Sequence, residues 1–343
     1  MSTWNLKSTV ELPRESCRKG QQFCCTSVLA GAEEEFQSQR GQMSALENPR
    51  PAVSGSARAL LTNAIDYAGL FPPSALSMTE AVSNFGRYWN CVESWMLGKF
   101  VVAASRLREL ESALIEVQNV ASPWQVSALV SMASADRELS HIVAFNDRNR
   151  DRAVVDSLEF KCSTNAELDY IAEHVPFGFS AYCEVSDPAV FVPLLVSAGL
   201  RAKVRMGGIT SDLFPSPAAV AEFLALCSTA NVPFKATAGL HHAIRSVHPL
   251  TYAADSPRWL MHGFLNVLLA AALAKSEASR RDVIDVLETE TVDAFHFDDQ
   301  KIAWRHWSFQ NEQLSKLRMG FALSFGSCSF EEPVRELCAM SLI

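Results

Sequence analysis

The feature that most constrains the fold is a regular alternation of short apolar runs with helical segments. The runs are rich in β-branched and aromatic residues, and each is followed by a stretch with helical periodicity, such as RLRELESALIEV or SPAAVAEFLALCSTAN. The first six runs are KFVVAA (99–104), QVSALVSM (125–132), VVDSLEFK (154–161), FSAYCEV (179–185), RAKVRMGG (201–208) and PFKATAG (233–239). This alternation predicts βα units that feed a parallel sheet.

Two further runs complete a set of eight. After a long connection that begins at His241, DAFHF (293–297) is the expected seventh strand, FALSFG (321–326) the expected eighth, and EEPVRELCAM a closing helix. Eight βα units predict an α/β fold, a (β/α)8 TIM-type barrel. An open doubly wound sheet would carry a glycine-rich fingerprint after its first strand, and KFVVAASRLREL has none.

The chain divides into a tail and a barrel. Residues 1–55 are rich in Ser, Gln, Glu and Arg and lack apolar periodicity, which predicts a disordered tail. Residues 56–343 form the expected barrel, which begins with two helices, ARALLTNAIDY and SMTEAVSNFGRYW.

Charge and cysteine usage exclude several classes of protein. A net charge of −8 without a basic stripe argues against nucleic acid. The longest apolar run, Phe264–Ala274, is too short to cross a bilayer. The N-terminus lacks the order of a secretory signal, and nine cysteines without a CxxC pair fit structural thiols in a reducing compartment. We therefore expect a cytoplasmic protein that acts on a small molecule, without a membrane partner, and a homo-oligomer remains open.

Charged side chains gather near the carboxyl ends of four consecutive strands. Because side chains alternate along a strand, they can be sorted into same-face pairs. The pairs are Glu159 with Lys161, Tyr182 with Glu184, Lys203 with Arg205, and Lys235 with Thr237. Structural salt bridges are one interpretation. A functional site is the better one, because burying such charges costs several kcal/mol and barrel enzymes keep their chemistry at this end.

The residue types suggest roles in Schiff-base chemistry on a small anionic carbonyl compound. A lysine beside another cation becomes a nucleophile, and Lys235 is our candidate. Glu184 or Glu159 would move protons, with Tyr182 and Lys161 as further catalytic candidates. The predicted substrate-binding residues are Lys203, Arg205, Gly207, Gly208, Thr237, His241 and His242.

Two alternatives remain open. Glu159 and Glu184 could join one or more histidines as metal ligands in an enzyme that stabilises an enolate. No HxxxH or HExxH spacing is present, so we expect neither metal nor cofactor. Alternatively, the barrel could bind a ligand or partner without catalysis, since fold does not fix function.

Three resemblances accompany these motifs. PFKATAGLHHAIR and RAKVRMGG resemble class I aldolases of the deoxyribose-phosphate type, in which the sixth strand carries the Schiff-base lysine and the seventh a second lysine. Here the two lysines fall on the expected strands five and six; one missed strand would give the Schiff-base role to Lys203. Glu159-x-Lys161 is similar to the Asp-x-Lys of the orotidine-monophosphate decarboxylase group, whose second aspartate is missing here. DYAGLFPP, FKATAGLHH and HGFLN resemble a bacterial barrel family of uncharacterised activity.

Overall fold

The computed structural model describes residues 53–117 and 122–343. The predicted tail therefore lies outside the described residues up to position 52. The described residues belong to one compact unit of the chain, Pro51–Ile343.

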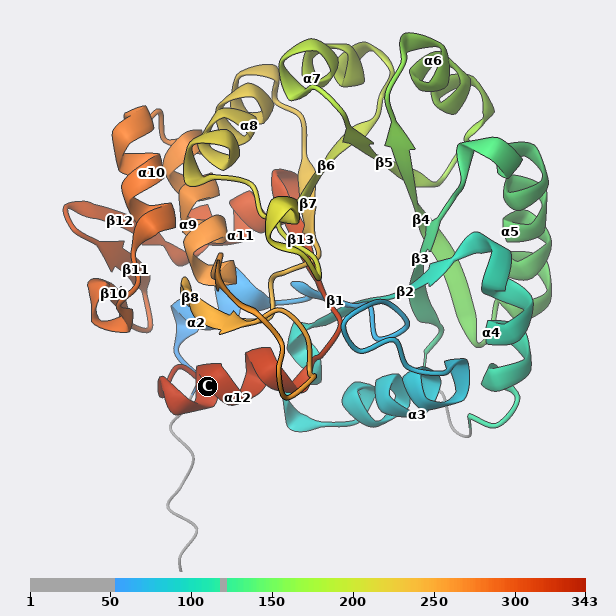
Figure 1. The fold of residues 1–343 in the computed structure, drawn as a ribbon, viewed down its shortest axis with the longest axis horizontal. Coiled ribbons are helices and arrows are strands. Elements are labelled where there is room, and N and C mark those ends of the chain that lie inside the picture. Colours follow the sequence, from blue (N-terminus) through green and yellow to red (C-terminus); the bar gives the residue numbers. More distant parts are fainter. Residues whose placement is uncertain (1–52, 118–121) are drawn as a thin grey trace, which may run out of the picture. The chain divides into compact units, whose positions relative to one another are not determined.

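Eight parallel strands close into a barrel, which confirms the predicted fold class. Each strand pairs with the next one along the chain, and the last pairs with the first, as the ring of strands in Figure 1 shows. The barrel strands are β1 (Ile65–Tyr67), β2 (Leu97–Ala103), β3 (Trp124–Leu129), β4 (Ala153–Cys162), β5 (Ser180–Val185), β6 (Arg201–Arg205), β7 (Phe234–Thr237) and β13 (Ala322–Ser327).

Helices surround the strands, and local capping explains where several of them begin. Ser77 and Thr164 form capping boxes with Glu80 and Glu167, whereas Ser216 caps a helix whose first residue is Pro217. The helices are α2 (Gly55–Leu61), α3 (Met78–Trp89), α4 (Leu107–Leu114), α5 (Ala135–Asn149), α6 (Asn165–His174), α7 (Pro188–Ser197), α8 (Pro217–Ala230), α9 (Phe264–Lys275), α10 (Arg280–Glu288), α11 (Asn311–Gly320) and α12 (Glu331–Ala339).

Two strand predictions were wrong, and the first of them, the missed strand β1, displaces the count of the next six strands by one. The segment around Ile65, predicted to be helical, contains β1, so α3 is the helix that follows the first barrel strand. DAFHF is not a barrel strand: β10 (Phe295–Phe297) pairs antiparallel with β11 (Lys301–Trp304), which pairs with β12 (Trp307–Gln310). Lys203 and Lys235 consequently lie on the sixth and seventh barrel strands, β6 and β7.

The connection between β7 and β13 is the largest departure from a regular barrel. It carries the antiparallel pair β8 (Ser246–Pro249) and β9 (Arg258–Met261), then α9 and α10, then the three-stranded sheet. In Figure 1 this sheet lies outside the ring of strands, beside α10. All residues of α9 from Phe264 to Leu273 are buried, as expected for a helix that is apolar on every side.

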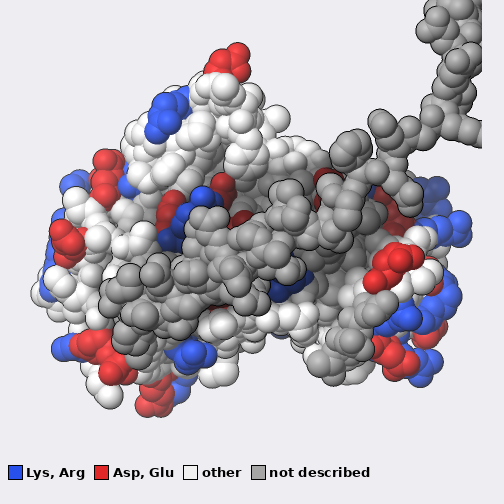
Figure 2. All heavy atoms as spheres, turned by 90° about the horizontal axis from the view of Figure 1, so that it is seen from below, with Lys and Arg blue, Asp and Glu red and all other residues white. Residues whose placement is uncertain are grey.

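Length and composition alone would allow one helical stretch of the described residues, Ser211–Ala230, to cross a membrane. Its main part, α8, packs against α7, α9 and α10 and contributes Phe223 and Leu224 to the core. A helix that packs against its neighbours in a barrel can therefore have the length and apolar composition of a membrane span. On the face drawn in Figure 2, positive and negative side chains are interspersed among the described residues without a continuous stripe of either sign.

Candidate functional site

A cavity of about 310 Å³ opens among the ends of the barrel strands. Loops after β1, β6 and β7 form half of its wall, and charged side chains from β4 and β6 also line it. Its lining residues are Ala68, Phe71, Pro72, Val101, Leu129, Glu159, Lys203, Arg205, Gly208, Ile209, Leu213, Thr237, Ala238, His241, Gly326 and Cys328. A mostly apolar cavity with a few convergent polar groups at this end of the strands is where barrel enzymes act.

Lys235 is the centre of a buried ion network. Its Nζ lies 2.7 Å from Asp66 Oδ2 on β1 and 2.6 Å from Glu159 Oε1 on β4. Ser324 donates a hydrogen bond to the same Asp66 oxygen, and Ser127 donates to the same oxygen of Glu159, both at 2.7 Å. With 1% exposure, Lys235 is a buried ammonium held by two carboxylates, and it is not among the residues that line the cavity.

Lys203 lies one strand away and lines the cavity. Its Nζ is 3.1 Å from Glu159 Oε2 and 3.2 Å from Glu184 Oε2, so Glu159 bridges the two lysines. Arg205 Nε is 3.2 Å from Glu184 Oε1, with 44% of the arginine side chain exposed. One member of each predicted same-face pair, Glu159, Glu184, Lys203 and Lys235, thus lies in a single network, and of the second members Arg205 joins them.

Neighbouring charges decide the ionisation of this network. Burial alone would raise the pKa of Glu159, but the ammonium groups of Lys235 and Lys203 hold it well below its usual range. Glu184 follows the same pattern: burial opposes ionisation, but Lys203 and Arg205 lower its pKa. For Lys235, burial would lower the pKa, but Asp66 and Glu159 raise it above its usual range. Lys235 therefore carries a positive charge throughout the physiological range.

Lys161 and Tyr182 lie away from the cavity lining, as do the catalytic candidates Lys235 and Glu184. Lys161 is exposed at the end of β4. Tyr182 is buried on β5, where its hydroxyl accepts a hydrogen bond from Arg201 at 2.9 Å and its ring lies 5.4 Å from Lys235 Nζ. Neither side chain is among those that line the cavity.

Of the predicted substrate-binding residues, some line the cavity and others do not. Thr237, Gly208 and His241 line the cavity with Lys203 and Arg205. A Cβ at Gly207 would lie 2.4 Å from the Phe214 ring, so close packing of the loop accounts for that glycine.

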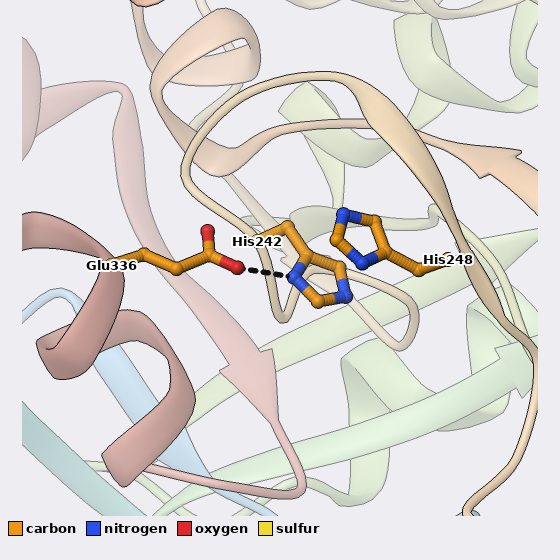
Figure 3. A group of neighbouring side chains, drawn as sticks. All are labelled: His242, His248 and Glu336. Carbon is orange, nitrogen blue, oxygen red and sulfur yellow. Dashed lines mark hydrogen bonds and ion pairs between the residues drawn. The ribbon is translucent and has the colours of Figure 1, made fainter. Parts of the chain in front are cut away.

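His242 points elsewhere. Its Nδ1 lies 2.5 Å from Glu336 Oε1 on α12, and the other oxygen of Glu336 accepts from the backbone of Ala243. Figure 3 shows this contact, with the His248 ring beside that of His242.

His242, His248 and Glu336 are close enough to share a metal ion. The two imidazole rings, however, lie parallel within 7° and 3.2 Å apart between centroids. A metal must lie close to the plane of each ligating ring, about 2.0 Å from its nitrogen, so one ring must rotate before both could bind one ion. Among the described residues, the ligand set proposed for an enolate-stabilising metal, Glu159 and Glu184 with histidines, does not come together as a metal-binding group.

Sequence reasoning missed two residues of the site. Asp66 lies within the three-residue strand β1, which the preceding helical periodicity concealed. Cys328 was interpreted as a structural thiol, yet it lines the cavity immediately after β13. The available signal for Asp66 was its position as an acidic residue between Ile65 and Tyr67, just before the AGLFPP loop.

Comparison with known proteins does not assign the chain to a family. No protein-family model and no curated protein searched matches the chain. Among solved structures, the chain is similar to a mutant of FabK from Thermotoga maritima. The TM-score is 0.36 and the sequence identity 13%, over 82% of this chain and 95% of that one. The fold assignment therefore rests on the strand order, and the site must be interpreted from its own geometry.

Proposed function

We propose that the protein is a carbon–carbon lyase of the aldolase type, which acts on a small anionic carbonyl compound through a Schiff base on Lys203. One observation carries the proposal: Lys203 lines the cavity, and its amine lies between two carboxylates next to a second, fully buried lysine. This arrangement combines a nucleophile, proton acceptors and a neighbouring cation.

The choice of Lys203 departs from our sequence-based choice of Lys235. A Schiff base requires a neutral amine that a carbonyl carbon can reach. Lys203 lines the cavity, whereas Lys235 does not meet the second condition, since it is 1% exposed and lies outside the cavity lining. Its fixed charge instead makes it the cationic neighbour of Lys203, with Glu159 between them. The strand count also agrees, since Lys203 is on the sixth barrel strand, the position of the Schiff-base lysine in the aldolases that this chain resembles.

The reaction then follows from the groups around the amine. The neutral amine of Lys203 adds to the carbonyl carbon, and loss of water gives an iminium ion. The iminium withdraws the electrons of the bond between the α- and β-carbons. As that bond breaks, the β-hydroxyl gives its proton to Glu159, which lines the cavity, the β-carbon leaves as a carbonyl product and an enamine remains. Protonation and hydrolysis of the enamine regenerate the lysine. Glu184, 3.2 Å from the amine, accepts and returns its proton, and Arg205 binds the substrate anion at the rim.

Borohydride trapping tests this function. The full chain is incubated with a panel of small aldehydes and keto acids, reduced with borohydride, digested and analysed by mass spectrometry. We expect a reduced adduct on the peptide that contains Lys203, because only an imine is fixed to the chain in this way. In Lys203→Arg the charge remains but no imine forms, so the adduct should disappear.

The matched control is Lys316→Arg, since Lys316 is a lysine on α11 with 70% of its side chain exposed and a single ion pair to Glu312. This variant should be trapped like the wild type. Absence of any adduct on Lys203 across the panel, or an adduct on Lys235 in its place, would contradict the proposal.

A further inference from the structure

A second group of reactive side chains lines the same cavity, on the strands that follow Lys203 around the barrel. Cys328 comes directly after β13 and His241 four residues after β7. The thiol sulfur lies 3.6 Å from Nδ1 and 3.9 Å from Nε2 of His241, and both side chains line the cavity with Lys203. A thiol beside an imidazole can exist as a thiolate–imidazolium pair.

Hydrogen bonds fix the two side chains against each other. The Tyr252 hydroxyl lies 3.7 Å from Cys328 Sγ. His241 Nδ1 is 3.0 Å from Ser327 Oγ and 3.6 Å from Glu332 Oε2. The exposed fractions of Cys328 and His241 are only 5% and 8%, so bulk water screens the pair little.

The surroundings favour the charged form of this pair. Burial would raise the pKa of Cys328, but His241 and hydrogen bonds from Ser74 and Tyr252 lower it. Burial would also lower the pKa of His241, but Cys328, Glu332 and Glu336 raise it.

The other charged or titratable groups that face the pair are Tyr67, His242 and His248. By contrast, burial raises the pKa of Cys183 to about 12. Among the described cysteines, Cys328 therefore differs from the buried Cys183, because its pKa is lowered and not raised.

We propose that Cys328 and His241 form an acid–base pair that carries a proton to and from the carbon next to the carbonyl carbon held by Lys203. This inference rests on the proposed function and adds that the substrate has a hydrogen on that carbon. The thiolate removes the proton: the C–H bond breaks, S–H forms, and the C=N electron pair moves to nitrogen as a neutral enamine forms. In the reverse direction the thiol returns the proton, and the imidazolium again balances the negative charge of the thiolate.

The first arm of the test needs no substrate. The full chain is treated with iodoacetamide over a series of pH values, and alkylation of each cysteine is followed by mass spectrometry, with exposed Cys338 and buried Cys183 as internal references. We expect Cys328 to stay reactive at pH values where an ordinary thiol is protonated, and His241→Asn to abolish that low-pH reactivity. Ordinary pH dependence, no effect of His241→Asn, or no alkylation of Cys328 in the native protein overturns the pair.

The second arm uses pyruvate as the probe, because it is a small anionic carbonyl compound with hydrogens on the adjacent carbon. Exchange of its methyl protons in D₂O is followed by NMR, and borohydride trapping is run in parallel. We expect Cys328→Ser to slow the exchange by roughly 10²-fold or more while the adduct on Lys203 still forms.

The outcomes separate the two hypotheses. Trapping on Lys203 with unchanged exchange in Cys328→Ser overturns the acid–base pair and leaves the Schiff base intact. Low-pH reactivity of Cys328 without trapping on Lys203 overturns the proposed function, and with it the role given to the pair, although the thiolate itself exists.

Discussion

At the scale of single residues, Lys235 is a buried cation that pairs with two buried carboxylates. Its ammonium forms ion pairs with both Asp66, on β1, and Glu159, on β4. Loss of that one group leaves the buried Asp66 without its ion pair and Glu159 with Lys203 alone, which is far more costly than loss of an ion pair in water. The same lysine thus stabilises the barrel and sets the charge around Lys203.

Replacement of Lys235 tests this contribution. We expect Lys235→Met to lower the free energy of unfolding by about 3–5 kcal/mol, because a buried ion pair is broken from one side. Lys316→Met removes an exposed pair with Glu312 and should cost about 0.5 kcal/mol or less. Urea unfolding monitored by circular dichroism measures both, and equal costs would contradict the buried ion network.

At the scale of elements, the strand ends and the loops after them build the cavity. The chain after β6 and the chain after β7 approach closely: a Cβ on Gly239, whose φ is +70°, would lie 2.7 Å from the Cα of Gly207. Both the backbone conformation and the space therefore require glycine at position 239. The contact fixes the loop after β7, which supplies Ala238 and His241 to the cavity.

A pair of alanine substitutions examines this contact. Gly239→Ala should destabilise the protein by about 2 kcal/mol or more, because a left-handed φ and a backbone clash act together. Gly320→Ala, at the end of α11, meets nothing within 4 Å and should be neutral or stabilising by up to about 1 kcal/mol. Thermal unfolding of the two variants beside the wild type measures the difference, and a harmless Gly239→Ala would show that the two loops do not constrain each other.

Sequence patterns predicted the long strands and failed on the short ones. Six apolar runs from 99 to 239, and FALSFG, all overlap barrel strands, and most of them are followed by a helix with clear periodicity. β1 has three residues, too few for a periodic signal, and β10 has a strand-like composition but pairs outside the barrel. Pairing partners are decided by packing over long sequence separations, which local patterns do not contain.

The candidate site was predictable in part for the same reason. Alternation placed Glu159, Glu184, Lys203 and Lys235 on inward faces, and they do form one network. Which lysine reaches the cavity depends on the depth of each side chain in the barrel, and that depth follows from strand stagger rather than from residue type. The proximity of Cys328 and His241, 87 positions apart in the chain, had no local signal.

At the scale of the whole molecule, the buried carboxylates link stability to pH. The folded-state pKa of Glu159 is lowered from 4.5, so its contribution is complete above pH 4.5 and is lost as the pH falls toward the folded-state value. His248, whose pKa is lowered from 6.5 to about 4 by burial and by His242, adds a loss between those two values. Both terms have the same sign, so stability should fall on acidification.

Unfolding midpoints in urea at a series of pH values measure this dependence. We expect the midpoint to fall progressively below about pH 6.5 and more steeply below 4.5, because there the unfolded chain binds a proton at Glu159 that the folded chain does not. Glu159→Gln should be less stable near neutrality and show a flatter curve. Parallel curves for Glu159→Gln and the wild type would show that Glu159 does not carry the acid dependence.

The ion network also has a consequence for how a ligand enters. Its three carboxylates, Asp66, Glu159 and Glu184, are matched by the three cations Lys203, Lys235 and Arg205, so the pairs leave no excess charge. An incoming anion therefore competes with a carboxylate for its cation. The Arg205–Glu184 pair is the most accessible place for that exchange. Displacement there would free Glu184 beside the amine of Lys203, so that ligand entry itself would deliver the proton acceptor.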